Sequence, residues 1–321
     1  MQIKLWGVRG SLPAPISNAE YRGKLASVIQ HVINSGIRDV SEIPSFINSL
    51  PDNLQHVYGG NTTCVTVTSA SGRMYIIDCG SGLRLLGYEL MKGECGRGEG
   101  AIDIFITHNH WDHIQGLPFF TPLYIRGNII TFHSPFKDQH QILSEQMRPP
   151  YFPAPFDKTE SSKNFMFLDP KHPTPLQIEE DLVIDYFPLK HPGGSFAYRF
   201  RQAGKTFIFA TDAEFTGQVL ENNAADHTFE FFGEADLLII DSQYTLDESF
   251  MKFDWGHTSY TMAVNCGLRW RVKELVMTHH EPAYSDAKLH ENHLAAIEHG
   301  QNCGNTSMKI HLATEGMIFT L

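Results

Sequence analysis

The sequence predicts an α/β protein in which helices cover β-sheets, and two features of the pattern support this fold class. Short segments typical of strands recur along the chain and alternate with segments of helical periodicity. Clusters of polar residues directly follow several of the apolar segments. In open sheets covered by helices, binding and catalytic sites usually lie at strand ends. We therefore expect these clusters to form the functional site.

The individual elements follow from the same pattern. Strands are predicted at 2–6, 62–68, 73–78, 102–106, 129–132, 182–187, 196–201, 206–210, 237–240, 274–278, 308–312 and 316–320. Helices are predicted at 19–35, 83–91, 137–146, 259–268 and 286–299. The stretch 148–175 is rich in Pro and aromatic residues and predicts a long loop. We expect one domain over 1–321, with a helical insertion at about 18–57 and a Pro/aromatic loop insertion at about 133–175.

Charge and cysteine usage restrict the function classes. The chain has 25 Lys plus Arg against 36 Asp plus Glu, a formal charge of −11, which argues against a large nucleic-acid footprint because phosphates are bound mainly by Lys and Arg. A local basic patch is compatible with this total. The five cysteines are scattered and odd in number, so we expect no disulfide framework and a cytoplasmic location. Neither a signal peptide nor an apolar run of about 18 residues is recognisable, so no membrane association is expected.

The strongest chemical signal is the motif His108-x-His110-x-Asp112-His113, which directly follows the apolar segment 102–106. Neutral imidazole and carboxylate are ligands that suit zinc, iron and manganese. A tight loop can direct His108 and His110 at one ion. Asp112 and His113 can then face a second ion about 3.5–4 Å away. The alternative is a surface loop that is merely rich in His, and the position after a buried strand favours the metal site.

Several motifs in order along the chain resemble the metallo-β-lactamase superfamily, and within it the phosphodiesterase branch that contains tRNase Z and cyclic-nucleotide phosphodiesterases. The resemblance covers nearly the whole chain apart from 18–57 and parts of 133–175. Its motifs are Ile76-Ile-Asp-Cys-Gly-Ser-Gly82, His108–His113, Leu189–Tyr198, Phe209–Glu214 and Val276–Asp286. It implies a four-layer αββα sandwich and two divalent metal ions, with Zn²⁺ as the default and Mn²⁺ or Fe²⁺ also compatible with the ligands.

The resemblance also implies which residues hold the metals. One ion is assigned to His108, His110 and His191, the other to Asp112, His113 and His279, and Asp212 is assigned as the bridge. A hydroxide shared by both ions would be the nucleophile. Asp112 is therefore predicted to be a catalytic residue as well as a metal ligand.

Three of these ligands carry weaker signals on their own. His191 could equally be an ordinary polar residue, and Asp212 could be a helix N-cap. His279 has His280 as a neighbour, and spacing alone does not choose between them.

A second predicted catalytic residue is His257, in the segment Trp255-Gly-His-Thr-Ser259. This segment is similar to the His-Ser-Thr segment of tRNase Z-like enzymes, whose His protonates the leaving oxygen, a task that suits an imidazole. The alternative is a local structural role beside a Thr258 or Ser259 N-cap. The tRNase Z family carries a His-Glu-Ala-Thr segment where this chain has Ile240-Asp-Ser-Gln-Tyr-Thr245, so Asp241 is a candidate to orient His257.

Four further groups are candidates for supporting the site or binding the substrate. Asp78 is expected to support a metal-binding His. Arg9 could contact a phosphate oxygen and Asn61 could hold its loop, although both also fit glycine-based structural turns. The aromatic residues of 149–156 could form a lid, with Tyr151, Phe152 or Phe156 stacking on a base, or could simply pack the loop.

These features predict a metal-dependent phosphodiesterase that acts on a small phosphodiester, first of all a cyclic nucleotide, with His257 as general acid. Three alternatives remain: an RNA 3′-end endonuclease like tRNase Z, a thioester or lactone hydrolase, and a metal-dependent sensor without catalysis. The full ligand set weighs against the sensor. The missing Gly- and Lys-rich arm lowers the expectation for tRNA, and a homodimer is expected from the resemblance alone.

Overall fold

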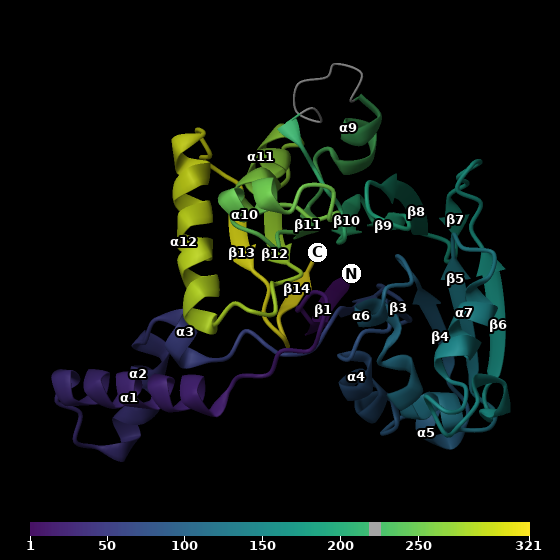
Figure 1. The fold of residues 1–321 in the computed structure, drawn as a ribbon, viewed down its shortest axis with the longest axis horizontal. Coiled ribbons are helices and arrows are strands. Elements are labelled where there is room, and N and C mark those ends of the chain that lie inside the picture. Colours follow the sequence, from purple (N-terminus) through teal and green to yellow (C-terminus); the bar gives the residue numbers. More distant parts are fainter. Residues whose placement is uncertain (218–225) are drawn as a thin grey trace.

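In the computed structural model, which describes residues 1–217 and 226–321, two seven-stranded sheets face each other and helices cover their outer faces (Figure 1). The four-layer arrangement predicted from the sequence is confirmed. No helix of the described chain is long and apolar enough to cross a membrane.

The first sheet combines parallel and antiparallel pairs. Its strands are β1 (Gln2–Gly7), β2 (Cys64–Thr68), β3 (Met74–Ile77), β4 (Ala101–Phe105), β5 (Ile129–Ser134), β6 (Ser162–Phe167) and β14 (Ile318–Thr320). The order is β14-β1-β2-β3-β4-β5-β6, and β3 to β6 run parallel. β3 and β4 therefore end at the same edge of the sheet.

The second sheet is built in the same way. Its strands are β7 (Leu176–Gln177), β8 (Leu182–Leu189), β9 (Ser195–Gln202), β10 (Lys205–Ala210), β11 (Leu237–Asp241), β12 (Glu274–Thr278) and β13 (Lys309–Leu312). The order is β13-β12-β11-β10-β9-β8-β7, and β10 to β13 run parallel. The carboxyl ends of β10, β11 and β12 consequently lie side by side.

Helices shield both sheets and extend the molecule at one side. They are α1 (Asn18–Ser35), α2 (Ile43–Ser49), α3 (Asp52–Gln55), α4 (Leu83–Leu90), α5 (Glu94–Arg97), α6 (Trp111–Ile114), α7 (Gln139–Gln146), α9 (Asp226–Phe232), α10 (Leu246–Met251), α11 (Tyr260–Arg269) and α12 (Asp286–Asn302). Helices α4, α5 and α7 lie outside the first sheet and α9 to α12 outside the second, whereas α1 to α3 project from the body below α12 (Figure 1). The short helix α6 lies at the edge where the two sheets meet (Figure 1).

The apolar core has three layers that match this architecture. The middle layer joins side chains of both sheets, and each outer layer joins one sheet to its helices. Phe105, at the end of β4, lies in the middle layer, where its ring contacts those of Tyr198 and Phe200 at centroid distances of 5.3 and 5.8 Å. Because the chain continues from Phe105 into the His108–His113 motif, this packing fixes the base of the motif.

The stretch 148–175 corrects one prediction, because it is not a single loop. It contains a 3₁₀ turn, Phe156–Lys158, and the edge strand β6. β6 is paired on one side only and all six of its residues are exposed or half-buried, so it lacks the buried apolar alternation that identifies strands in a sequence.

Replacing Phe105 with Ala is expected to lower the free energy of unfolding by about 3–5 kcal/mol, because it leaves a cavity between the sheets. The measurement is urea denaturation of metal-free protein. Ile129→Ala on β5 is the control, since Ile129 is 46% exposed and should change stability much less. Equal losses for both variants would contradict the assigned role of Phe105.

Candidate metal centre

The predicted metal ligands converge at the carboxyl ends of strands in both sheets. His108 and His110 lie in the loop after β4, and Asp112 and His113 lie in α6. The remaining three follow strands of the second sheet: His191 after β8, Asp212 after β10 and His279 after β12. All except the exposed His110 are buried.

Three imidazoles and one carboxylate oxygen form the first group of ligand atoms. Nε2 of His191 lies 3.1 Å from Nδ1 of His110 and 3.7 Å from Oδ1 of Asp212. Nε2 of His108 lies 3.5 Å from the same oxygen. These four atoms lie within 4.8 Å of one another, as a set of ligands around one ion requires.

The second group uses the other oxygen of Asp212. This atom, Oδ2, lies 2.9 Å from Nε2 of His113 and 3.3 Å from Nε2 of His279. Oδ2 of Asp112 lies 3.3 Å from Nε2 of His113 and 3.2 Å from Nε2 of His279. The two oxygens of Asp212 therefore face two different sets of ligands, which is the geometry of a carboxylate between two ions.

The donor atoms present fit divalent cations. A tetrahedral set of nitrogen and oxygen ligands at about 2.0–2.1 Å from zinc places neighbouring ligand atoms roughly 3.3 Å apart, close to the separations found here. Nε2 of His108 and Oδ2 of Asp212 are also buried without a hydrogen-bond partner among the described residues. Buried polar atoms are rarely left unpaired, so a cation between the two groups would satisfy both.

The ring nitrogens that face away from the cluster are held by other groups. Nδ1 of His113 lies 2.7 Å from Asp78, and Nδ1 of His191 lies 2.8 Å from the carbonyl oxygen of Gly256. Nδ1 of His279 lies 3.2 Å from Oε1 of Gln243. Such contacts fix the orientation and tautomer of metal-binding imidazoles. Asp78 thus lies where the sequence predicted a supporting residue.

Electrostatics keep the imidazoles of the first group neutral. Burial and the nearby imidazole of His113 lower the pKa of His108 well below its usual value. Burial likewise lowers the pKa of His110 and of His191, and the opposing effect of Asp212 is smaller. Neutral imidazole is the form that binds metal, so these three side chains need no deprotonation to act as ligands.

The second group is balanced differently. Burial favours neutral imidazoles, but Asp212 and Asp112 outweigh it and raise the pKa of His113 well above its usual value. The same competition between burial and carboxylates raises the pKa of His279 to about 9. Protons therefore compensate the buried carboxylates when no cation is present, and a bound cation would replace those protons.

Three of the eight non-glycine residues with a positive φ in the described chain lie in this centre. Asp78, Asp212 and His279 have φ angles of 61°, 57° and 63°, in the left-handed region that non-glycine residues seldom adopt. Asp78 and His279 directly follow strands β3 and β12, and Asp212 lies two residues after the end of β10. Local strain of this kind persists where the surrounding structure imposes it, often at functional sites, and here it turns the side chains towards the cluster.

His257 and Asp241 lie beside the second group. Nδ1 of His257 is 2.8 Å from Oδ2 of Asp241, and the His257 ring lies 5.0 Å from that of His279. Asp241 is fully buried and also accepts hydrogen bonds from the backbone NH groups of Asp212 and Thr258. The pairing that the sequence left open is therefore present, and Asp241 connects His257 to the carboxylate between the two groups.

Arg9 corrects a prediction, because its guanidinium group is occupied. Arg9 donates hydrogen bonds to the carbonyl oxygens of Gly59, Glu281 and Tyr284 and is 4% exposed. It holds together the loops beside the centre and is not free to contact a phosphate. Asn61 is also structural, since its side chain donates to Glu315 and accepts from Ser81.

The neighbouring histidine, His280, is separated from the cluster. Its Nε2 lies 2.8 Å from the carbonyl oxygen of Ala313, and burial beside Arg9 lowers its pKa to about 3. Only His279 reaches the ligand groups.

The predicted lid is reduced to one exposed residue. Phe156 is buried in the core outside the first sheet, and Phe152 packs edge-on against Phe119. Tyr151 is 74% exposed, with the Arg148 guanidinium 6.0 Å from its ring centroid, and of the three proposed stacking residues it is the exposed one. The structural interpretation of this loop therefore accounts for Phe152 and Phe156.

Sequence reasoning overlooked several groups that shape the centre. The side-chain oxygen of Gln243 accepts from Nδ1 of His279 and its amide nitrogen donates to Glu281. The NH group of Ser11 donates to Asp112. Gly10 and Gly256 pack directly on imidazole rings, because a Cβ at either position would lie within about 2.5 Å of His279 or His191. The sequence offered a signal for Gly256, because it directly precedes the predicted catalytic residue His257. It offered none that links Gly10 to His279.

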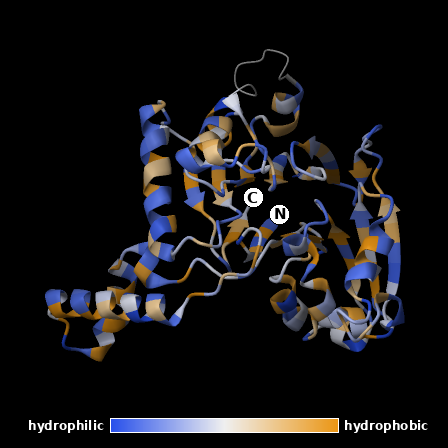
Figure 2. Ribbon diagram, viewed as in Figure 1, coloured by the Kyte–Doolittle hydropathy of each residue, from blue (hydrophilic) through white to orange (hydrophobic). Residues whose placement is uncertain are grey.

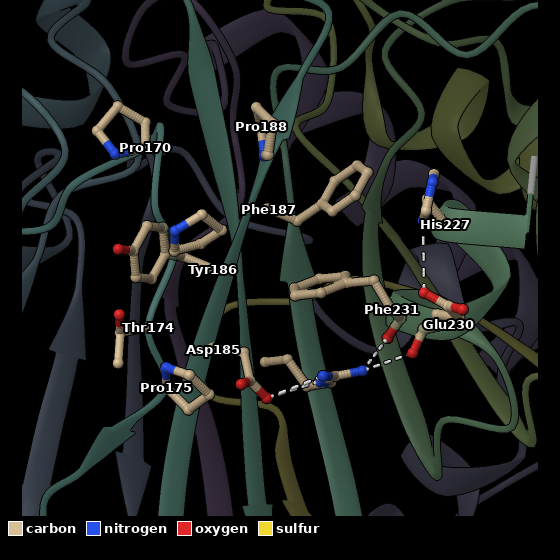
Figure 3. A pocket seen from close by; sticks show the side chains of 12 residues that line it. Pro170, Thr174, Pro175, Asp185, Tyr186, Phe187, Pro188, His227, Glu230 and Phe231 are labelled. Carbon is tan, nitrogen blue, oxygen red and sulfur yellow. Dashed lines mark hydrogen bonds and ion pairs between the residues drawn. The ribbon is translucent and has the colours of Figure 1, made fainter.

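A hollow of about 370 Å³ lies elsewhere, between the Pro170–Pro175 loop, β8 and α9 (Figure 3). The rings of Phe187 and Phe231 lie next to each other in its wall, with centroids 5.1 Å apart (Figure 3). Asp185 and Arg199, which form an ion pair, also line it. None of the predicted ligands lines it, so it is separate from the candidate metal centre.

Replacing Gly256 with Ala is expected to reduce metal affinity about 10–100-fold, the loss typical when a contact orienting a ligand is disturbed. Its Cβ would lie 2.2 Å from Nδ1 of His191. Metal content after dialysis measures the effect. Gly204→Ala is the control, because Gly204 also has a positive φ, 73°, but open space around it. Similar metal losses in both variants would attribute the effect to backbone strain and contradict the contact argument.

Comparisons with known proteins agree with this geometry. A family model described as the β-lactamase superfamily domain matches residues 73–280. Ribonuclease Z of Prochlorococcus marinus (strain MIT 9515) is 26% identical over 269 residues, which cover 69% of this chain and 82% of that protein. The metallo-β-lactamase-fold protein YhfI from Bacillus subtilis has a TM-score of 0.63 at 16% identity, with 99% of this chain and 98% of that chain covered.

The short form of human tRNase Z shares the fold as well, with a TM-score of 0.58 at 19% identity and coverage of 100% and 99% of the two chains. The family model spans more than half of the chain, and the related proteins include ribonuclease Z. The chain therefore belongs to the metallo-β-lactamase superfamily and has tRNase Z-like relatives.

Proposed function

We propose that this chain hydrolyses phosphodiester bonds at the candidate metal centre. The observation that carries the proposal is the His257–Asp241 pair beside the two ligand groups. An imidazole held at Nδ1 by a carboxylate has its other nitrogen, Nε2, available to donate a proton. The ribonuclease Z relatives support hydrolysis as the general activity.

Two divalent ions, with zinc as the first candidate, would be held by the two groups that Asp212 connects. When bound, they supply positive charge that neutralises phosphoryl oxygens and makes a water molecule more acidic. Asp112 contributes a ligand oxygen in the second group, and the NH group of Ser11 holds that carboxylate in place.

The protein itself supplies the proton for the leaving group. His257 donates from Nε2 to the departing oxygen, and Asp241 holds the ring at Nδ1 through the 2.8 Å contact. Asp241 also fixes the backbone of Asp212 and of Thr258. The acid and the carboxylate between the ligand groups are thereby held at a set separation.

Two observations favour different substrates for this hydrolysis. The ribonuclease Z relatives favour RNA 3′-end cleavage. The charges favour a small phosphodiester such as a cyclic nucleotide, because cations beside the centre are already paired. Lys190 contacts Glu214 and Asp254 at 2.6 and 2.9 Å, and Lys252 contacts Glu281 at 3.5 Å.

Replacing His257 with Ala is expected to lower kcat by about 10²–10⁴-fold on a substrate with a ribose leaving group. The loss should be much smaller on bis-p-nitrophenyl phosphate, because p-nitrophenolate departs without protonation. Steady-state kinetics of both substrates measure the difference. Metal content must stay unchanged, since His257 also lies near ligand atoms. An equal loss on both substrates would contradict the role as acid.

A turnover screen of metal-loaded protein separates the two substrate classes. We expect hydrolysis of 3′,5′- or 2′,3′-cyclic nucleotides whose rate changes little between 50 and 200 mM salt. An RNA substrate bound through several phosphates should lose roughly 10³–10⁵ in affinity over the same range. Cleavage of a tRNA precursor with steep salt dependence, and no turnover of cyclic nucleotides, would replace the small substrate with RNA.

A further inference from the structure

Two tryptophans beside the candidate metal centre are exposed. Trp111 is 79% exposed and Trp255 is 61% exposed. The other two tryptophans of the chain have partners inside the protein, because Trp6 donates a hydrogen bond from Nε1 and Trp270 stacks on Phe232 with ring centroids 4.3 Å apart. Aromatic rings stabilise a fold mainly through their buried area. Two such rings left in water at one site therefore point to a ligand.

Trp111 marks the side on which the first ligand group opens to solvent. It is the first residue of α6 and lies between the predicted ligands His110 and Asp112. Of the predicted ligands, His110 is the one that is exposed. Gly193 and Gly194 leave space beside it: among the described residues, a Cβ at Gly193 would meet Nε2 of His110 at 3.9 Å, and a Cβ at Gly194 would meet nothing within 4 Å.

Trp255 lies on the other side of His191. It directly precedes Gly256, whose carbonyl oxygen is 2.8 Å from Nδ1 of His191. Nε2 of the same imidazole is 3.1 Å from Nδ1 of His110, the residue before Trp111. One imidazole ring therefore separates the two backbone segments that carry the exposed tryptophans.

Trp255 also lies close to the proposed acid, His257. Consecutive Cα atoms are about 3.8 Å apart, so the Cα atoms of these two residues are less than about 8 Å apart. In the proposed reaction His257 protonates a ribose oxygen, and the base of a nucleotide is attached to that same ribose. An indole ring beside His257 is therefore within reach of the base.

The segment that leads to Trp255 is apolar for a surface. The outer helix α12 presents mostly hydrophilic residues (Figure 2), as expected for a helix in contact with water. Between 246 and 255, by contrast, the exposed large apolar side chains are Leu246, Phe250, Met251, Phe253 and Trp255. Nζ of Lys252 lies 5.8 Å from the centroid of the Trp255 ring, near the outer limit of a cation–π contact, so the ring remains accessible to a flat ligand.

We propose that Trp111 and Trp255 form a nucleobase subsite beside the candidate metal centre. The inference rests on the proposed phosphodiesterase function and restricts its substrates to nucleotides, as against phosphodiesters without a base. The base stacks on Trp255, next to the acid, and Trp111 borders it on the open side of the first ligand group. Every base has a π-face that stacks on aromatic rings, so the subsite selects the class of substrate and not one particular base.

The charges around the centre favour a ligand held by stacking. Lys190 is paired with Glu214 and Asp254, and Lys252 is paired with Glu281. These cations are already compensated, so they add little to the binding of a phosphate. A phosphodiester without a base would depend on the metal ions alone, whereas a nucleotide also gains the contact with the indole rings.

The test compares the binding of AMP and of ribose 5-phosphate to metal-loaded protein by isothermal titration calorimetry. The two probes share the ribose and the phosphate and differ in the base. We expect AMP to bind about 5–150-fold more tightly, the gain typical of one stacked base. Trp255→Ala should remove most of this difference, and Trp255→Phe should retain most of it because an aromatic face remains. Tyr88→Ala is the matched control, since Tyr88 is an exposed aromatic residue of α4, outside the first sheet.

Trp111→Ala requires two additional readouts, because Trp111 adjoins two predicted ligands. Metal content and the affinity for ribose 5-phosphate should stay at wild-type values while the affinity for AMP falls. In steady-state kinetics on 3′,5′-cyclic AMP, KM should rise more than kcat falls in both Trp→Ala variants, because stacking holds the substrate before and during the reaction.

A free nucleotide and the end of an RNA chain both present a base beside a phosphate, and the dinucleotide pApA distinguishes them. We expect pApA to bind no more tightly than AMP, as a subsite for a single nucleotide requires. A further gain of about fivefold or more from the second base would retain the stacking chemistry and identify an RNA end as its source.

Three outcomes would overturn the proposal: equal affinity of wild type for AMP and ribose 5-phosphate, a Trp255→Ala variant that weakens both probes alike, or loss of the difference in Tyr88→Ala. Binding of AMP does not require turnover. A preference for AMP without hydrolysis would keep the subsite and reject the proposed function, whereas hydrolysis without this preference would do the reverse.

Discussion

The arrangement of the centre depends on compensating several buried carboxylates in one place. Asp78, Asp112, Asp212 and Asp241 are each at most 5% exposed. Removing an ionised carboxylate from water costs several kcal/mol unless hydrogen bonds and opposite charge replace the lost solvation. Asp78 and Asp241 obtain this from backbone NH groups and from one imidazole each. Asp112 accepts one backbone hydrogen bond, from Ser11. Asp112 and Asp212 otherwise depend on His113 and His279, so they are the carboxylates for which a bound cation adds most.

The fold meets this requirement by facing two sheets so that their strand ends share one edge. β3 and β4 supply Asp78 and the His108–His113 motif, whereas β10, β11 and β12 supply Asp212, Asp241 and His279. Parallel strands make this possible because their carboxyl ends lie together. The left-handed conformations of Asp78, Asp212 and His279 show that the turn after a strand is bent towards the centre in both sheets. A ribonuclease Z-like hydrolase of this superfamily therefore places its chemistry where the architecture already gathers backbone ends.

The sequence predicted what is local and missed what depends on packing. The His108–His113 motif, the strand ends and the helix at 19–35 are visible because they occupy short stretches with clear periodicity or composition. The Asp241–His257 pair joins residues 16 apart, and only a resemblance suggested it. Gln243 could not be identified, because an amide after a strand has no signature until its neighbour His279 is placed. Arg9 illustrates the opposite error: an arginine near a predicted site suggested phosphate binding, but three carbonyl oxygens already occupy its guanidinium group.

Arg9 also explains how the insertion that contains α1 to α3 is joined to the centre. Its guanidinium group lies 3.7 Å from Asp286, the residue that pairs with Lys24 of α1. It also bonds the backbone of Glu281 and Tyr284, in the segment that follows His279. Because Asp286 is 3% exposed, its charge must be compensated by both Arg9 and Lys24, and α1 supplies Lys24. The insertion is therefore attached through a buried charge, and the same charge balance holds the segment that follows a predicted metal ligand. The insertion at 18–57 looks peripheral in the sequence, but through Lys24 and Asp286 it helps to hold the loops beside the site.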